Sequence, residues 1–332
     1  MILAGDIGGT HARLAFFQSQ NGHLTPVAEG VFPSRDHSGL DEIVGQFVAK
    51  QSLRPDVACF GVAGPVRNGK VETSNLPWTV EASRLAGELH LPSTMLINDL
   101  EANAWGIASL GDQDLVALNR VKGMPVGNQG VISAGTGLGE AGLFWNGNGY
   151  EIFASEGGHC DFAPRTELEI ELLRYLVARF GHVSFERIVS GPGLVNVYNF
   201  LRDTHRGEEP QWLTDELAQG DQAATISRAA VAGKSVLAEQ ALDLWISIYG
   251  AEAGNLALKL MATGGVFLGG GIAPKIVPKL SSPLFMQAFV SKGRLQPLLE
   301  SIPVKVITND KIALFGAARY AVAKGTPQNS RP

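Results

Sequence analysis

One pattern occurs twice along the chain and constrains its fold more than any other: an apolar strand, a glycine-rich loop and a second apolar strand. In the first copy Gly5–Thr10 is followed by Ala12–Phe17, and in the second Ala134–Gly139 is followed by Glu140–Trp145. Each copy is typical of a hairpin, because glycine lets the backbone turn tightly between two strands. The pair predicts a duplicated architecture in which both loops face a shared cleft.

Around these hairpins, strand-like and helix-like stretches alternate, which indicates an α/β protein. The polar region 206–222 is interpreted as a surface insertion, and the tail 325–332 as frayed. We expect strands at residues 2–5, 14–17, 27–32, 57–63, 94–97, 130–133, 141–145, 266–268 and 304–307, and helices at 39–50, 81–90, 100–110, 166–180, 234–261 and 312–323.

The composition is that of a globular protein. Its 332 residues predict about two domains by length, and with 45% hydrophobic and 18% charged residues there is enough apolar material for their cores. The 27 basic and 32 acidic residues nearly cancel, so no surface for nucleic acid or anionic lipid is expected. No run of about 18 apolar residues occurs, so we expect no membrane span. The start of the chain lacks the basic region of a signal peptide, so we expect no secretory leader. The two cysteines, Cys59 and Cys160, exclude a disulfide framework and fit a reducing, cytosolic compartment.

Two stretches resemble nucleotide-binding motifs without meeting their requirements. Gly64–Lys70 begins like a P-loop, but Val71 replaces the hydroxyl residue that would hold magnesium, and no helix can follow. Gly137–Gly142 fits G-x-G-x-x-G, yet a strand-like segment follows where a dinucleotide site needs a helix. A hairpin turn is the better interpretation of both.

The two glycine hairpins could still bind an anion, although they are neither P-loops nor dinucleotide-binding motifs. Successive backbone N–H groups in such loops can point at an anion without a lysine. Asp6, at the mouth of the first loop, could orient a hydrated magnesium ion, which prefers a few carboxylates and keeps its waters. Each hairpin alone is better explained as a plain β-turn with a solvated aspartate, whereas the two together favour the anion site. A third cluster, Gly264–Pro274, ends a strand in three glycines, which favours either a flat ring lying against bare backbone or a tight turn into a helix.

Polar side chains occur where a ligand crevice is expected. Asn98 and Asp99 end an apolar strand, and such strand ends face the crevice of α/β sheets. Asp99 would either cap the next helix or accept a proton from a substrate hydroxyl. Glu156, His159 and Glu186 add carboxylate and imidazole groups, which suit a polyhydroxylated sugar because each hydroxyl both donates and accepts. A lone His159 would more often be structural, and the seven histidines lack the spacing of a metal site.

Taken in order, these segments resemble the bacterial glucokinase family of the actin-like ATPase and hexokinase superfamily. The resemblance covers nearly the whole chain, and the ordered combination is specific although each piece alone is not. The cysteine-rich zinc signature of the ROK-type sugar kinases is missing, so the chain does not resemble that group. The matching segments are Gly5–Arg13, Ile97–Glu101, Ala134–Gly139, Glu156–Pro164, Ser184–Gly193 and Gly264–Pro274.

The resemblance implies an activity and a role for each residue. The activity is ATP-dependent phosphorylation of D-glucose to glucose 6-phosphate, the first step of glycolysis. Asp99 would be the catalytic base toward the sugar 6-hydroxyl, and Asn98, Glu156, His159 and Glu186 would hold the other hydroxyls. Asp6 would hold Mg²⁺ through water. Groups that would clasp the ATP phosphates are Asp6, Gly8, Gly9, Thr10, Gly135, Thr136 and Gly137, and Gly269, Gly270 and Gly271 would lie near the adenosine.

The resemblance also implies a two-lobed, duplicated ribonuclease H-like fold with a ligand cleft between the lobes. We expect a small α/β domain from residues 1–110 plus 301–324, a large α/β domain from 111–300 and a flexible tail at 325–332. A cytoplasmic homodimer is expected from the family. One departure is His11, where the family usually has asparagine after Gly-Gly-Thr; an imidazole is bulkier and can become charged.

Two other classes of function stay open at this point. One is a kinase for another hexose, such as mannose or fructose, or one that uses polyphosphate as donor. The other is a non-catalytic sugar-sensing protein on the same fold, which would bind sugar without turning over ATP. Asp99 and both hairpins argue against the second.

Overall fold

The computed structural model describes residues 1–20, 22–73, 76–123 and 125–325, and they fall into two compact units. Unit 1 comprises residues 1–113 together with the segment that begins at Asn309, and unit 2 comprises Asp114–Thr308. Each unit is built on its own sheet. The expected domain division, 1–110 plus 301–324 against 111–300, stays a prediction.

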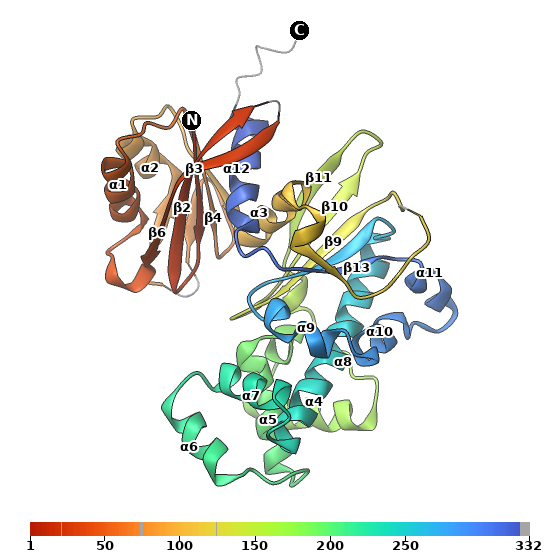
Figure 1. Cartoon of the computed structure of the whole chain (residues 1–332). Coiled ribbons are helices and arrows are strands. Elements are labelled where there is room, and N and C mark those ends of the chain that lie inside the picture. The colour runs from red at the N-terminus through yellow and green to blue at the C-terminus, as the bar shows by residue number, and fades with distance from the viewer. Residues whose placement is uncertain (21, 74–75, 124, 326–332) are drawn as a thin grey trace. The chain divides into compact units, whose positions relative to one another are not determined.

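The sheet of unit 1 has five strands in the order β3-β2-β1-β4-β7 (Figure 1). Strands β1, β2 and β3 form an antiparallel meander, and β4 and β7 continue the sheet parallel to β1. Their bounds are Ile2–Ile7 for β1, His11–Gln20 for β2, His23–Pro33 for β3, Val57–Val62 for β4 and Met95–Asn98 for β7.

The sheet of unit 2 repeats this plan in the order β11-β10-β9-β12-β13-β8. Strands β9, β10 and β11 form the antiparallel meander, β12 and β13 follow in parallel, and β8 adds an antiparallel edge. This repeated strand order confirms the expected α/β class and its duplication. The bounds are Gln129–Ala134 for β9, Leu138–Trp145 for β10, Tyr150–Ser155 for β11, Gly265–Gly269 for β12, Val304–Ile307 for β13 and Leu115–Ala117 for β8.

Helices cover the sheet of unit 1 because their apolar residues recur at helical spacing. In α1 (Leu40–Gln51), Leu40, Ile43, Val44 and Phe47 are buried along one face. The other helices are α2 (Ala82–Leu89), α3 (Asp99–Gly106) and α12 (Ile312–Gly325), and the short strands β5 (Lys70–Glu72) and β6 (Thr79–Glu81) form a separate pair.

The last helix, α12, completes the core around the first strand. Its residues Ala313, Leu314 and Ala317 are buried in one cluster with Ile2 and Ala4 of β1. Helix α12 also lies directly against α3, as Figure 1 shows. Gly106 of α3 and Gly316 of α12 allow this approach, because a Cβ at either would overlap a backbone carbonyl of the other helix, that of Ile312 and that of Ala102 respectively. Small residues therefore fix the distance between the two helices.

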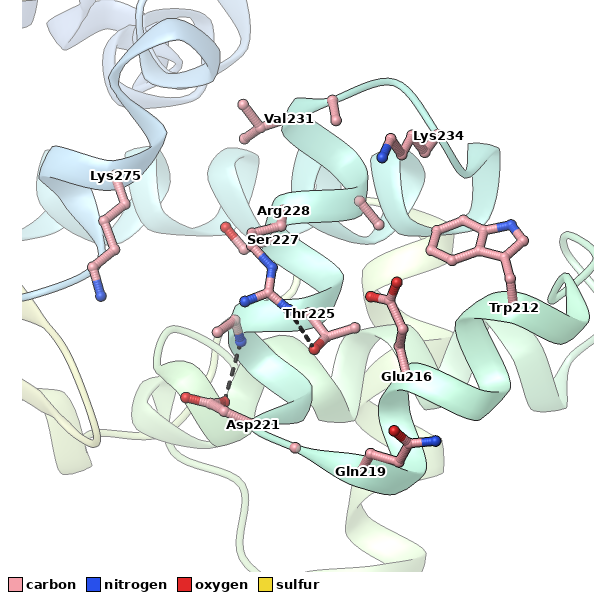
Figure 2. Close-up of a pocket in the computed structure, with 14 residues that line it drawn as sticks. Trp212, Glu216, Gln219, Asp221, Thr225, Ser227, Arg228, Val231, Lys234 and Lys275 are labelled. Carbon is pink, nitrogen blue, oxygen red and sulfur yellow. Dashed lines mark hydrogen bonds between the residues drawn. The ribbon is translucent and has the colours of Figure 1, made fainter.

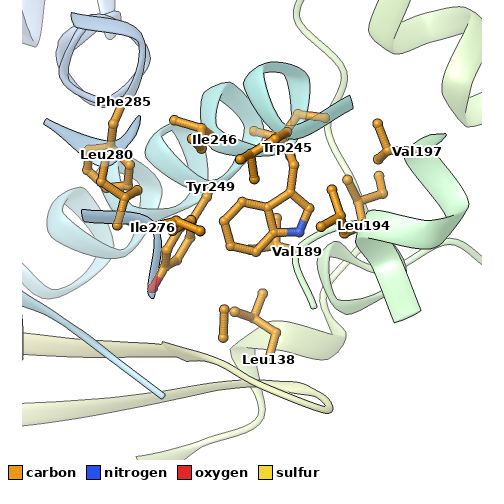
Figure 3. Packing of buried hydrophobic residues seen from close by; sticks show 14 of the residues in the cluster. Leu138, Val189, Leu194, Val197, Trp245, Ile246, Tyr249, Ile276, Leu280 and Phe285 are labelled. Carbon is orange, nitrogen blue, oxygen red and sulfur yellow. The ribbon is translucent and has the colours of Figure 1, made fainter. Parts of the chain in front are cut away.

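The core of unit 2 is built around the long helix α8 (Val236–Leu260), whose Trp245 and Tyr249 are fully buried (Figure 3). The polar group of each ring is hydrogen-bonded: Trp245 Nε1 donates to the Ser190 carbonyl at 3.2 Å, and the Tyr249 hydroxyl donates to the Ile132 carbonyl at 3.1 Å. Burying each large side chain contributes about 1.5–3 kcal/mol. The remaining α-helices are α4 (Glu167–Phe180), α5 (Gly191–Asp203), α6 (Gln211–Gln219), α7 (Gln222–Val231), α9 (Val277–Leu280), α10 (Pro283–Val290) and α11 (Gln296–Glu300).

The expected strands and helices are present, and the structure adds others that the sequence analysis did not expect, among them β11, α5 and α7. The region 206–222 is not a mere polar insertion: it contains α6, which buries Leu213 and Leu217 in the core of unit 2. Residues 182–185, which are apolar enough to suggest a short strand, make only a single bridge, Asp161 with Ser184, before a 3₁₀ turn. Gly325 closes α12, and the rest of the expected tail, 326–332, lies outside the described residues.

Both rejected nucleotide motifs are turns or strands, as expected. Arg67 and Lys70 exchange backbone hydrogen bonds across a two-residue turn, with Asn68 at φ 52° and Gly69 at φ 71°, and β5 follows. Gly137–Gly142 runs into β10. Among the described residues, no helix combines the length and the apolar character needed to cross a membrane.

Candidate active site

The first glycine loop joins β1 to β2 and is closed by its own hydrogen bonds. The Gly8 N–H donates to the His11 carbonyl at 3.0 Å. Ser34 supports the loop from outside: its hydroxyl donates to the Gly8 carbonyl at 2.8 Å and its N–H to the Thr10 carbonyl at 2.9 Å. The Gly8 N–H is therefore used inside the turn, and Gly9 and Thr10 form the tip.

Asp6 and Asp99 lie close together at the carboxyl ends of β1 and β7. Gly61 of β4, between these strands, brings them together, since a Cβ there would lie 2.9 Å from the Ala102 Cβ and 3.8 Å from the Asp99 Cα. Burial, and secondarily the charge of Asp99, raises the pKa of Asp6 to about 6, against the opposing effect of Arg13. Sequence reasoning missed Gly61, although an isolated glycine inside a strand is a signal of close approach.

The start of α3 shows which residue caps the helix. Asn98 is the N-cap: its Oδ1 accepts from the Leu100 N–H at 2.8 Å, and its Nδ2 donates to the Gly64 carbonyl at 3.1 Å. The Asp99 carboxylate accepts from the same Leu100 N–H at 3.0 Å. The capping position, one of the two roles considered for Asp99, thus belongs to Asn98.

A long-range ion pair supports Asp6 from the side. Arg13, which faces Asp6 across the β1–β2 ladder, donates through Nη1 to the Asp310 carbonyl at 2.6 Å, and its Nη2 lies 3.1 Å from the Asp310 carboxylate. The two residues are 297 positions apart in sequence, and nothing local in the chain predicts their pairing.

The second glycine loop, between β9 and β10, is built in the same way. The Gly135 N–H donates to the Gly137 carbonyl at 2.8 Å, and the Gly135 carbonyl accepts from Gly191 at the start of α5 at 2.8 Å. The third glycine cluster packs against this loop. Gly270, at φ 81°, lies so close to Ala134 that a Cβ there would overlap the Ala134 backbone. The structure therefore brings Gly135–Gly137 and Gly269–Gly271 together.

The three residues expected to hold sugar hydroxyls form one open cluster. His159 Nε2 lies 4.0 Å from the Glu156 carboxylate, and His159 Nδ1 lies 4.0 Å from the Glu186 carboxylate. The Glu156 and His159 side chains are 67% and 60% exposed, whereas Glu186 is half-buried because its Oε2 accepts from the Leu138 N–H at 3.0 Å. This bond places the cluster directly beside the second glycine loop.

A cavity of about 1000 Å³ opens along helices α6 and α7 (Figure 2). Asp221 caps α7 at its edge by accepting from the Ala224 N–H at 3.1 Å, and Arg228 donates to the Thr225 hydroxyl at 3.1 Å. The cavity borders α7, and Ala223 at the start of this helix would lie 3.6 Å from a Cβ at Gly191, whose N–H donates to Gly135 of the loop. Sequence reasoning missed its lining, which includes Trp212, Glu216, Asp221, Ser227, Arg228 and Lys275.

Comparison with known proteins assigns the chain to a family. A glucokinase family model matches residues 3–324. The glucokinase of Nostoc sp. is 46% identical over 97% of this chain and 98% of its own length, and that of Synechocystis sp. is 42% identical over 95% and 96%. The chain belongs to the glucokinase family. The resemblance seen in the sequence is thereby confirmed.

Solved structures agree with this assignment. A crystal structure of glucokinase from an Antarctic psychrotroph has a TM-score of 0.84, 30% identity, and coverage of 97% of this chain and 99% of its own. A ROK family glucokinase from Streptomyces griseus, solved with glucose and AMPPNP, has a TM-score of 0.63 at 22% identity and shares the fold alone. The chain has the actin-like ATPase fold of this glucokinase family, and its separation from the ROK group stays a prediction.

Within each unit, the expected site residues of this glucokinase family member lie together. Unit 1 gathers Asp6, the loop Gly8–Thr10, Asn98 and Asp99. Unit 2 gathers Gly135–Gly137, Gly269–Gly271 and the cluster of Glu156, His159 and Glu186. His11, the departure from the family pattern, is exposed at the first loop, and its carbonyl serves the turn.

Proposed function

We propose that this protein transfers the γ-phosphoryl group of ATP to the 6-hydroxyl of D-glucose and releases glucose 6-phosphate. The observation that carries the proposal is the open cluster of Glu156, His159 and Glu186, bonded through Glu186 to the second glycine loop. Phosphoryl transfer depends on positioning and charge stabilisation, and this arrangement puts hydroxyl-binding groups beside a loop suited to phosphate.

The cluster offers the acceptors and donors that a sugar requires. Carboxylate oxygens accept from hydroxyl protons, and the imidazole can donate or accept, so adjacent hydroxyls can be held in fixed positions. The exposure of Glu156 and His159 leaves these atoms available to a ligand. We assign Asn98 a smaller share in binding, because its Oδ1 caps α3 and its Nδ2 donates to the Gly64 carbonyl.

Asp99 acts in this proposal as the base that orients the 6-hydroxyl and takes its proton. It stands at the N-terminus of α3, where the helix dipole favours the ionised carboxylate. A carboxylate at hydrogen-bond distance from the attacking hydroxyl contributes typically 10²–10⁴-fold to the rate.

Asp6 fits a divalent cation. The Asp6 carboxyl group is buried, and the negative charges of Asp99 and Asp310 act on it. Arg13 supplies the opposing positive charge. This excess of negative charge is what a hydrated Mg²⁺ relieves, and we place the ion on Asp6 through water. When bound, Mg²⁺ supplies charge neutralisation to the ATP phosphates.

The nucleotide is proposed to lie along unit 2. The tips of the two glycine loops, at Gly9–Thr10 and Thr136–Gly137, would receive the phosphates. The cavity beside α7 would receive the adenosine, since its lining includes Lys275, on the turn that follows Gly269–Gly271. ATP has a base and a ribose that could fill this cavity, whereas polyphosphate has neither, so the cavity favours ATP as the phosphoryl donor.

A coupled assay with glucose, ATP and Mg²⁺ tests the proposal directly. We expect glucose 6-phosphate formation that depends on all three components. Mannose and fructose, and polyphosphate in place of ATP, are the comparison substrates. Sugar binding by calorimetry without ATP turnover would instead establish a sugar-sensing protein. A cytoplasmic homodimer belongs to the same proposal, and light scattering of the purified protein tests the dimer.

A further inference from the structure

A buried carboxyl group lies directly beneath the turn that carries Glu156 and His159. Glu140 of β10 is 1% exposed, and it faces Ser155 in the β10–β11 ladder. Gly157 rests on this side chain so closely that a Cβ there would overlap the Glu140 carboxylate, and the Gly157 N–H donates to the Ser155 hydroxyl at 3.0 Å. Glu140 is therefore the floor of the turn.

Glu140 meets a second buried carboxylate on α8. Glu252 is fully buried and lies close enough for its negative charge to act on the Glu140 carboxyl group. Glu252 also accepts from Lys259 Nζ at 3.1 Å and from Asn255 Nδ2 at 2.7 Å. Among the described residues, Glu140 Oε1 has no partner that donates to it. Two carboxyl groups can hydrogen-bond each other only if one carries a proton.

The surroundings keep that proton on the pair at neutral pH. Burial first, and then the negative charge of Glu252, raises the pKa of Glu140 to about 8, against the opposing effect of Lys259. Of the other groups near Glu140, Tyr249 donates its hydroxyl to the Ile132 carbonyl, and Cys160 is exposed at the end of the turn. Of the groups that shift the pKa of Glu140, only Lys259 is positively charged.

We propose that Glu140 is a positioning residue for the sugar-binding turn Glu156–His159, and that it holds this turn through a proton shared with Glu252. The inference rests on the proposed role of Glu156 and His159 in binding glucose. Removal of the proton leaves two buried negative charges side by side, and the part that can shift in response is Gly157–Gly158 of the turn above Glu140. Sugar affinity should fall as the proton is lost, while the chemistry of bound sugar is retained.

The kinetic test compares wild-type protein with Glu140→Gln between pH 7 and pH 9. Glutamine keeps the shape and a donor toward Glu252 but cannot ionise. At pH 9, about a tenth of the wild-type molecules retain the proton, so KM for glucose should rise about 10-fold over its pH 7 value, with kcat changed less than 2-fold. In Glu140→Gln, KM for glucose should stay within about 2-fold across the range.

Two control variants separate other causes of an alkaline effect. Glu151→Gln changes an exposed carboxylate on the neighbouring strand β11, and Cys160→Ser removes the thiol next to His159. Both should keep the wild-type rise in KM. A rise in Glu140→Gln that parallels the wild type would overturn the proposal, and so would loss of the rise in Cys160→Ser.

Amide hydrogen exchange tests the stability of the turn Glu156–His159 without any substrate. The His159 N–H donates to the Glu156 carbonyl at 3.0 Å and the Cys160 N–H to the Gly157 carbonyl at 2.9 Å, so both amides should be protected from hydrogen exchange. Relative to the intrinsic rate at each pH, wild-type protection should fall about 10-fold from pH 7 to pH 9, and protection in Glu140→Gln should not. Unchanged wild-type protection would overturn the positioning role, even if the protein does not phosphorylate glucose. Conversely, a glucose assay without turnover would refute the proposed function and leave this result standing.

Discussion

Asp99 stands where strand β7 gives way to helix α3, and its neighbour Asn98 makes the bond that a capping residue would make. This division leaves the helix start intact when Asp99 is altered. The position is therefore well suited to mutation, because a loss of activity there would report on chemistry more than on folding.

Replacement of Asp99 with Ala or Asn should lower kcat by about 10²–10⁴-fold while glucose still binds, because the proposed base is removed and the proposed sugar contacts of unit 2 remain. Steady-state kinetics and isothermal titration with glucose measure the two effects. Asp36→Asn, an exposed aspartate on a 3₁₀ turn, is the matched control and should keep wild-type turnover. Near-normal turnover in both Asp99 variants would remove the residue from the role of base.

The raised pKa of Asp6 predicts a pH dependence of magnesium binding. Only the carboxylate form attracts the cation, so at pH 5, one unit below the pKa of about 6, roughly a tenth of the molecules are competent. The Mg²⁺ concentration for half-maximal activity at saturating ATP should thus fall about 10-fold between pH 5 and pH 7. Asp6→Asn should weaken Mg²⁺ binding at every pH and flatten this profile; a flat wild-type profile would contradict the assignment.

The same shift has a defined sign for stability. Between about pH 4 and pH 6 the folded protein holds a proton on Asp6 that the unfolded chain has lost, so this group makes the folded state less stable as pH rises through that window. Such a cost is typical of a residue kept for its function, and a bound cation would offset it.

At the scale of elements, the contact of α3 with α12 depends on glycine. Gly316→Val should lower the free energy of unfolding by about 1–3 kcal/mol, because the side chain would overlap the Ala102 carbonyl and push the two helices apart. Denaturant unfolding of the whole protein measures the change. Gly87→Ala on α2, where a Cβ meets nothing within 4 Å, is the matched control and should be neutral or slightly stabilising.

Helix α7 offers a test of the nucleotide cavity. Ser227→Trp places an indole in the space beside Arg228, so KM for ATP should rise about 10-fold or more while KM for glucose stays within 2-fold. Arg174→Trp, at an exposed position on α4, controls for the added ring. An unchanged KM for ATP in Ser227→Trp would move the adenosine out of this cavity.

At the scale of the whole molecule, the duplication was predictable because short sequence patterns indicate it. Each copy combines an apolar strand with glycines that only a tight loop explains, and both sheets have the same order of antiparallel and parallel partners. The residues of the cluster proposed to bind sugar, Glu156, His159 and Glu186, were predictable for a similar reason, since carboxylate and imidazole groups occur within short turns. In these cases residue type and spacing carry the information.

The remaining features depend on contacts between distant segments. Arg13 and Asp310 pair across 297 positions, and Glu140 and Glu252 meet only because α8 packs on the sheet of unit 2. Neither pair leaves a periodicity or motif in the sequence. Helix α6 was interpreted as a polar insertion because its two buried leucines are outnumbered by polar residues. Tertiary packing determines these contacts, and they cannot be predicted from the periodicity of a single sequence.

The seating of α12 against β1 sets the order in which the protein can mature on the ribosome. Strand β1 leaves the exit tunnel roughly 15–60 s before α12, at 5–20 residues per second. Unit 2 is translated in full during that interval, whereas unit 1 must wait with Ile2 and Ala4 uncovered. The half of the enzyme that is begun first is thus the half that is finished last.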